Sequence, residues 1–312
     1  MNTAARLAAY GAGLAVAFAA AFATAAAVVP ESAVTDRQNG TTMKHDAGHG
    51  SAGADGAAAA AGHGAGTSHA PAGTSLSAGG YVLSAVQAPS AAGGTGDLSF
   101  RILHANGTPV TAYRQQHEKD LHLIVVRSDG SRFRHVHPAL DVTTGTWSIP
   151  WTWDAGGSYR VFADFRPAGA AEGVTLTRTV DVAGELRPAS PSGPRTVDTV
   201  DGYRAELTGD LVAGGQSDLR VTLTRDGAPV TTLQPYLGAF GHLVALREGD
   251  LAYLHVHAEG DEPRPGQTSG PTVDFAAHAP TAGRYLLYLD FQVQGTVRTA
   301  TFVLDAAPDG HH

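Results

Sequence analysis

Two copies of one pattern, His-x12-His-x-His, constrain this 312-residue chain more than any other feature. The first copy consists of His122, His135 and His137, and the second of His242, His255 and His257. The copies are offset by 120 residues, the distance from His122 to His242. Imidazole is a common metal ligand near neutral pH, so three histidines that converge, twice, indicate metal binding.

The residues between the histidines predict how they meet. Asp129-Gly130 and Gly249-Asp250 each separate two apolar runs, which favours a β-hairpin with a two-residue turn. Directly opposed Cβ atoms lie about 4.5–5.5 Å apart, so the three imidazoles on one face can close on one ion. The predicted opposed pairs are His122 with His137 and His135 with Ile124 in the first copy, and His242 with His257 and His255 with Val244 in the second.

The alternative is a hydrogen-bonded histidine cluster with a purely structural role. Residues 107–137 and 227–257 share ten identities in 31 aligned positions, and all three histidines are among them, which favours metal. Arg127 and Arg134 have the opposite parity to the histidines along their strands, so we expect the histidines on the inward face of a sandwich.

The first 30 residues indicate export. One positive charge, Arg6, precedes the uncharged run from Leu7 to Val29, which is long enough to cross a bilayer. ATAAA at 23–27 also offers a signal-peptide cleavage site. An uncleaved membrane anchor is favoured over a signal peptide because signal cores are shorter, and in both cases the remaining chain is extracytoplasmic.

Composition narrows the ligand and partner classes. The chain has no cysteine and only two methionines, so any transition-metal site depends on histidine, which favours Cu(II) or Zn(II) over a methionine-based Cu(I) carrier. The net charge of −8 argues against a nucleic-acid partner.

Short runs rich in Val, Leu, Thr, Tyr and Phe, separated by turn residues, predict an all-β fold. We expect two tandem immunoglobulin-like or cupredoxin-like β-sandwiches, with one large barrel as the alternative. The predicted order is an anchor or signal (1–30), a disordered Gly/Ala/His-rich linker (31–79), the first sandwich (80–185), a Pro-rich linker (186–200), the second sandwich (201–307) and a tail (308–312). The linker histidines, which we expect to capture metal weakly, are His45, His49, His63 and His69.

Two further residue pairs align between the halves. Asp164 corresponds to Asp290, and each is a candidate fourth ligand or a partner for the second N–H of a ligating histidine, unless it simply faces outward. Tyr159 corresponds to Tyr285, and both suit a tyrosine corner. Histidines without a counterpart are read as surface residues: His104, His117 and His278.

The sequence HLIVVRSDGSRFRHVHP, followed by YRVFADF, resembles the secreted YtkA-like β-sandwich proteins found beside bacterial copper and heavy-metal handling systems. CopC-type periplasmic copper carriers offer a looser analogy. The resemblance implies metal binding at His122, His135 and His137 first, and at the second triad next, where Ala258 replaces Pro138.

Three functional classes follow. The leading one is a non-enzymatic extracytoplasmic protein for copper or zinc, tethered to the membrane by its N-terminal segment, with a membrane metal transporter as a partner. The second is a membrane-tethered interaction module with structural histidines. The third, a zinc hydrolase or hydratase, ranks last because no nucleophile motif is present and Glu118 has only Gly238 as its counterpart.

Overall fold

The computed structural model describes residues 73–189, 193–254, 256–264 and 266–308, which form β-strands joined by turns. Within these residues no helix is long and apolar enough to cross a membrane. The predicted N-terminal anchor lies outside the described residues. The same holds for His255 and for the four linker histidines, His45, His49, His63 and His69.

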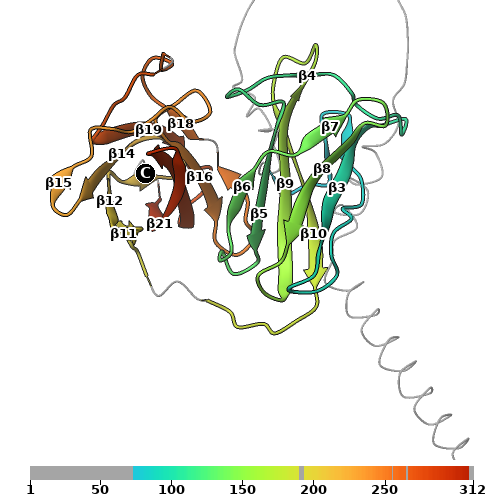
Figure 1. Cartoon of the computed structure of the whole chain (residues 1–312), viewed down its shortest axis with the longest axis horizontal. Coiled ribbons are helices and arrows are strands. Elements are labelled where there is room, and N and C mark those ends of the chain that lie inside the picture. Colours follow the sequence, from blue (N-terminus) through green and yellow to red (C-terminus); the bar gives the residue numbers. More distant parts are fainter. Residues whose placement is uncertain (1–72, 190–192, 255, 265, 309–312) are drawn as a thin grey trace, which may run out of the picture. The chain divides into compact units, whose positions relative to one another are not determined.

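The first repeat, β1 to β10, consists of two sheets (Figure 1). One has the order β1-β2-β3-β8-β7 and the other β10-β9-β5-β6, with β4 added to β9. The strands are β1 (Ser77–Ala78), β2 (Tyr81–Leu83), β3 (Thr95–His104), β4 (Tyr113–Arg114), β5 (Leu121–Arg127), β6 (Arg134–Val136), β7 (Ala139–Asp141), β8 (Thr146–Thr152), β9 (Gly157–Pro167) and β10 (Val174–Val182).

The second repeat, β11 to β21, has corresponding sheets. Their orders are β11-β12-β14-β19-β18, with β15 added to β14, and β13-β21-β20-β16-β17. The strands are β11 (Val197–Val200), β12 (Tyr203–Thr208), β13 (Leu211–Val212), β14 (Gln216–Arg225), β15 (Ala228–Pro229), β16 (His242–Arg247), β17 (Tyr253–Leu254), β18 (Val256–Ala258), β19 (Thr272–His278), β20 (Gly283–Val293) and β21 (Thr296–Ala307).

Each repeat is an all-β sandwich with the strand order of the immunoglobulin fold. In that fold, strands A, B, E and D form one sheet and C, F and G the other, which matches β2-β3-β8-β7 opposite β10-β9-β5. Both predicted tyrosine corners are confirmed: Tyr159 Oη donates to the carbonyl of Ala155, and Tyr285 Oη to that of Thr281, each over 2.9 Å. The single-barrel alternative is wrong.

The ordered chain extends into both predicted linkers. β1 lies in the segment predicted as disordered and pairs with β2, while β11 lies in the Pro-rich linker and pairs with β12. The predicted starts of the sandwiches at residues 80 and 201 are therefore several residues too late. These short edge strands have little hydrophobic alternation, and backbone hydrogen bonds hold them in place.

The first hairpin has the predicted register but a different turn. Ile124 lies opposite His135, as expected. However, Gly130 N–H donates to the carbonyl of Arg127, and Arg127 N–H donates to that of Ser131. Arg132, with φ of 58°, then adds one residue to the returning strand, which restores the register expected for a two-residue turn.

The face assigned to the histidines needs correction. Leu121, Leu123 and Val125 enter the core of the first sandwich, whereas Ile124 and Val126 join a separate apolar cluster. That cluster joins the two repeats, and its other buried members are Phe162, Val244, Leu246, Leu251, Leu286, Tyr288 and Val303. Alternation shows which residues share a face, but β5 is buried on both faces, so it cannot show which face is the core.

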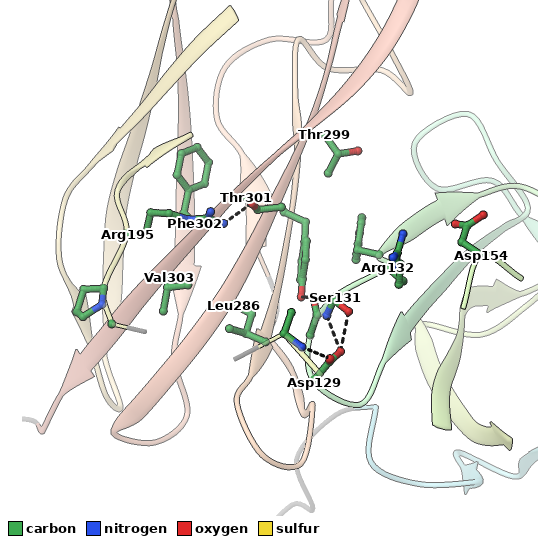
Figure 2. A pocket seen from close by; sticks show the side chains of 16 residues that line it. Asp129, Ser131, Arg132, Asp154, Arg195, Leu286, Thr299, Thr301, Phe302 and Val303 are labelled. Carbon is green, nitrogen blue, oxygen red and sulfur yellow. Dashed lines mark hydrogen bonds between the residues drawn. The ribbon is translucent and has the colours of Figure 1, made fainter. Parts of the chain in front are cut away.

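The assignment assumed that Arg127 faces solvent, but this side chain is buried. Its guanidinium donates to both carboxylate oxygens of Asp129, over 3.0 and 2.7 Å, and to the carbonyl of Arg187. Asp129 also accepts the N–H of Ala189, so this pair fixes the chain that leaves the first repeat. Asp129 and residues from both repeats line a cavity of about 850 Å³. Figure 2 shows the side chains that surround it.

Removing a side chain from the cluster between the repeats tests their packing. Ile124 is 0% exposed, and Ile124→Ala should lower the free energy of unfolding by about 2–5 kcal/mol. Val142, which is 64% exposed, supplies the control, because Val142→Ala should change stability by less than about 0.5 kcal/mol. Equal, small effects of both substitutions in denaturant unfolding would show that the repeats do not pack through this face.

Candidate metal centre

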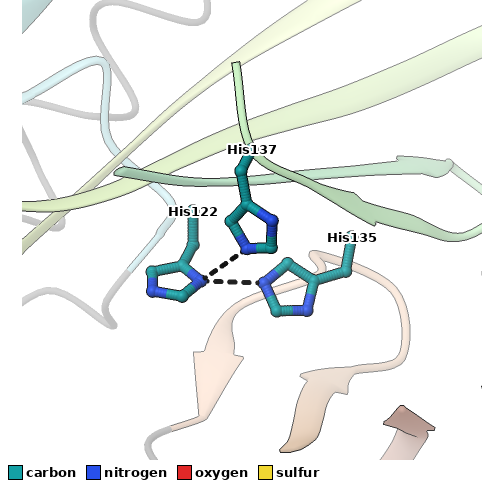
Figure 3. Close-up of side chains that lie close together, drawn as sticks. All are labelled: His122, His135 and His137. Carbon is teal, nitrogen blue, oxygen red and sulfur yellow. Dashed lines mark hydrogen bonds between the residues drawn. The ribbon is translucent and has the colours of Figure 1, made fainter. Parts of the chain in front are cut away.

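Three histidines of the first repeat converge (Figure 3). His122 lies on β5, His135 on β6, and His137 directly after β6. His122 Nδ1 lies 3.0 Å from His135 Nε2 and 3.2 Å from His137 Nε2, and one ring nitrogen from each residue lies within 4.8 Å of the other two. We call these residues the three-histidine group.

Hydrogen bonds on the outer side of two rings determine which nitrogens face one another. His122 Nε2 lies 2.9 Å from the carbonyl of Gln116, so it carries the proton and leaves the Nδ1 lone pair pointing inward. His135 Nδ1 lies 2.9 Å from Asp290 Oδ2 and donates to it, which leaves the Nε2 lone pair pointing inward. In the neutral rings, two lone pairs therefore face each other across 3.0 Å.

A cation resolves this repulsion, and the spacing suits one. Three nitrogens on a tetrahedral ion with bonds of about 2.0–2.1 Å are about 3.3 Å apart, close to the 3.0 and 3.2 Å found here. The group can therefore accept Zn(II) or Cu(II) with small movements of the rings. One coordination position on a tetrahedral ion would remain for water or another ligand.

Burial keeps the rings of His122 and His137 neutral. Desolvation is the main cause that lowers the pKa of His122 to about 3 and that of His137 to about 3, and the neighbouring His135 lowers both further. A metal must displace any proton on a ligating nitrogen. Near pH 7 both rings are therefore neutral, and a metal ion does not have to displace a proton from a positively charged imidazole of His122 or His137.

Asp290 pairs with a histidine, which is one of the two roles expected from the sequence. Its partner, however, is His135 of the other repeat. Asp290 lies on β20 of the second repeat, His135 lies on β6 of the first, and both side chains are 4% exposed. Thr299 Oγ1 donates to the other carboxylate oxygen over 2.6 Å. Such a carboxylate fixes the ring orientation and the tautomer of a ligating histidine.

Asp164 is half-buried and shares the face of the sheet that carries His122, rather than facing outward. It lies opposite His122 in the register of β5 and β9, and it accepts a hydrogen bond of 2.9 Å from Thr175 Oγ1. Burial raises its pKa to about 6. Asp164 is absent from the three-histidine group that the structure brings together.

The described residues do not reproduce this arrangement in the second repeat. The predicted register holds at the turn, where Leu246 pairs with Tyr253. The chain then crosses to the other sheet earlier than in the first repeat, so His257 lies on β18 and pairs with Ala276 instead of opposing His242. The predicted opposition of His242 and His257 is wrong, and His255 lies outside the described residues.

His117, interpreted from the sequence as a surface residue, belongs to this region. Its ring centroid lies 5.1 Å from that of His242 and 6.0 Å from that of His122. Its side chain is exposed, but it reaches across the repeats. It has no histidine counterpart in the second half, so the repeat pattern gave no signal for it.

A cavity of about 380 Å³ adjoins the three-histidine group. His122 and His135 form part of its wall. The other polar residues in the wall are Gln116, His117, Asp164, Arg166, Glu172, Thr175, His242, Tyr253 and His257.

One family model matches most of this chain. A model for a domain of unknown function, DUF8832, matches residues 77–182 and 198–308, which together make up more than half of the sequence. The chain belongs to the DUF8832 family. Both matched segments coincide with the two β-sandwich repeats. No curated protein matches this DUF8832 chain.

Solved structures show distant likeness to the DUF8832 chain. Invasin, a bacterial integrin-binding protein, is 12% identical with a TM-score of 0.22, and the match covers 73% of this chain and 39% of that chain. The D0-D1 domain of intimin is 10% identical with a TM-score of 0.21, and the match covers 72% and 96%. The adhesin InvE of Yersinia pseudotuberculosis is 11% identical with a TM-score of 0.21, at 75% and 60% coverage. Such likeness says nothing about function.

The lowered pKa of His122 predicts acid sensitivity of the metal-free protein. In the unfolded chain the pKa of His122 is 6.5, whereas in the folded protein it is about 3. The free energy of unfolding should therefore fall as the pH drops through this window, by up to about 1.4 kcal/mol per pH unit. His122→Asn removes the titration, so its stability should depend less on pH when both proteins are unfolded with denaturant at several pH values.

The raised pKa of Asp164 acts in the opposite sense, because the folded state then binds a proton more readily than the unfolded chain. Asp164 is present in both proteins, so the difference between their profiles isolates His122. Parallel profiles would contradict the prediction.

Proposed function

We propose that this protein binds Cu(II) or Zn(II) at His122, His135 and His137 and serves in extracytoplasmic copper or heavy-metal handling. The observation that carries the proposal is the pair of inward lone pairs on His122 Nδ1 and His135 Nε2, 3.0 Å apart. The carbonyl of Gln116 and the carboxylate of Asp290 hold them in that state. The proposed role is non-enzymatic, as expected from the sequence, in which no nucleophile motif accompanies the histidines.

The compartment is part of the proposal and depends on the sequence. An uncharged run from Leu7 to Val29 after a single arginine favours export, with the repeats outside the cytoplasm. The absence of cysteine leaves histidine as the main transition-metal ligand for such a site. The partner that this context favours is a membrane metal transporter, and the resemblance to YtkA-like proteins supports the same role.

The competing function is an interaction module with a structural histidine cluster. In that case a proton, not a metal ion, occupies the gap between the two rings, with a positively charged His135 paired to Asp290. The ring positions alone are compatible with both occupants. Metal titration distinguishes the two functions, because saturable binding of an ion is expected only if the histidines are metal ligands.

Paired substitution of the ligands tests the proposal. The 312-residue chain is purified in detergent with six histidines in the terminal segments outside the described residues, at 45, 49, 63, 69, 311 and 312, replaced by alanine, which we call the reduced-histidine background. Calorimetric titration with Zn(II) and Cu(II) should show saturable binding. His122→Ala with His137→Ala should abolish one equivalent because two of three ligands are lost.

His104→Ala with His278→Ala is the matched control, since neither residue lines the cavity, and it should bind as the background does. Absence of saturable binding in the background itself, or unchanged binding after loss of His122 and His137, would rule out the proposed metal function and favour the interaction module.

Asp290→Asn tests the carboxylate that the second repeat contributes. The asparagine keeps the shape but removes the charge that supports His135, and loss of such a partner typically weakens metal affinity by about 10–100-fold. Asp274→Asn removes an exposed carboxylate of the same repeat, paired with Arg220, and should leave the affinity unchanged. Competition titration against a chelator measures both variants, and equal affinities would exclude a role for Asp290 at the site.

A further inference from the structure

His242 is held in the same way as a ligand of the three-histidine group. His122 Nε2 meets the carbonyl of Gln116 over 2.9 Å, and His242 Nε2 meets that of Tyr236, the equivalent residue, over 3.0 Å. The carbonyl of Leu237 lies 2.9 Å from the same nitrogen. His242 therefore carries its proton on Nε2 and presents a lone pair at Nδ1, which accepts no hydrogen bond from the described residues.

His117 lies where it can share an ion with His242. The two rings are 5.1 Å apart, centroid to centroid, and both line the cavity beside the three-histidine group. The backbone at His117 and Glu118 is left-handed, with φ of 49° and 63°. Non-glycine residues adopt this conformation at a cost, and here it belongs to the turn that carries His117 toward the second repeat.

The cavity wall contains acidic residues that can attract a cation. Its wall includes the carboxyl groups of Asp164 and Glu172 and a further histidine, His257, with Arg166 as the opposing charge. Arg166 already donates to the carbonyls of Ala170 and Ala171, so its charge is directed toward that loop.

We propose that His117 and His242 form a second position for Cu(II) or Zn(II), built across the two repeats, with His257 in the same cavity as a further nitrogen donor. This inference rests on the proposed function, because it places the second ion beside the first. His242 and His135 are 6.4 Å apart, centroid to centroid, so the two ions would be close neighbours. His117 is exposed whereas His122 is 6% exposed, so the second position lies on the solvent side of the first.

Two nearby Cu(II) ions give a signal that isolated ions do not. In the reduced-histidine background, titration should give two equivalents of Cu(II), and the electron paramagnetic resonance spectrum of the loaded protein should show spin coupling between them. His117→Ala with His242→Ala should lose one equivalent and the coupling, and should keep the affinity of the remaining ion. His117→Ala alone, at an exposed position, should weaken only the second equivalent and guards against misfolding of the double variant.

The outcomes separate this inference from the proposed function. One equivalent that is lost with His122 and His137 but unaffected by His117 and His242 would overturn the second position and leave the first intact. Two equivalents with no spin coupling, or coupling that persists without His117 and His242, would also overturn it. No saturable binding at all would remove both proposals. The His104→Ala, His278→Ala control should retain two coupled ions.

Discussion

The face-to-face packing of one sheet from each repeat is the contact on which the site depends. Ile124 and Val126 from β5 pack into one apolar cluster with Leu246 and Leu286 of the second repeat. The stacked rings of Phe133 and Tyr288, 4.0 Å apart and almost parallel, extend it. Because the histidines of β5 and β6 share this face, the same packing brings Asp290 to His135 and closes the cavity. The site therefore belongs to the pair of repeats.

The two repeats meet through equivalent surfaces, as the subunits of a symmetric dimer do. Phe133 packs on Tyr288, and Tyr253, the counterpart of Phe133, lies near Phe162, the counterpart of Tyr288. The symmetry ends where the chain leaves this sheet. β6 continues to Val136, whereas β17 ends at Leu254, which sends His257 to the opposite sheet. Two nearly identical histidine patterns thus lead to different arrangements.

The features that could be predicted from the sequence are the local ones. Alternation and the turn residues predicted the register of the first hairpin and that of the second hairpin beside its turn, and the aligned Tyr159 and Tyr285 predicted the tyrosine corners, because these features depend on neighbouring residues. The burial of β5 on both faces, the crossing after Leu254 and the approach of His117 to His242 depend on packing between distant segments. Asp290 shows the limit clearly: its pairing with a histidine was considered, but the histidine belongs to the other repeat.

The carboxylate that crosses the repeats would link the proposed metal binding to their packing. An ion on His135 Nε2 would withdraw electron density from the ring, which would make Nδ1–H a stronger donor to Asp290. The hydrogen bond that joins the repeats would then be stronger in the loaded protein, and by linkage any interaction that holds the repeats together would raise the affinity for the ion. The first repeat alone would keep three histidines but lose the charge that orients one of them. The second sandwich has no matching three-histidine group among its described residues. It nevertheless contributes to the site, because it supplies the carboxylate of Asp290 that orients His135.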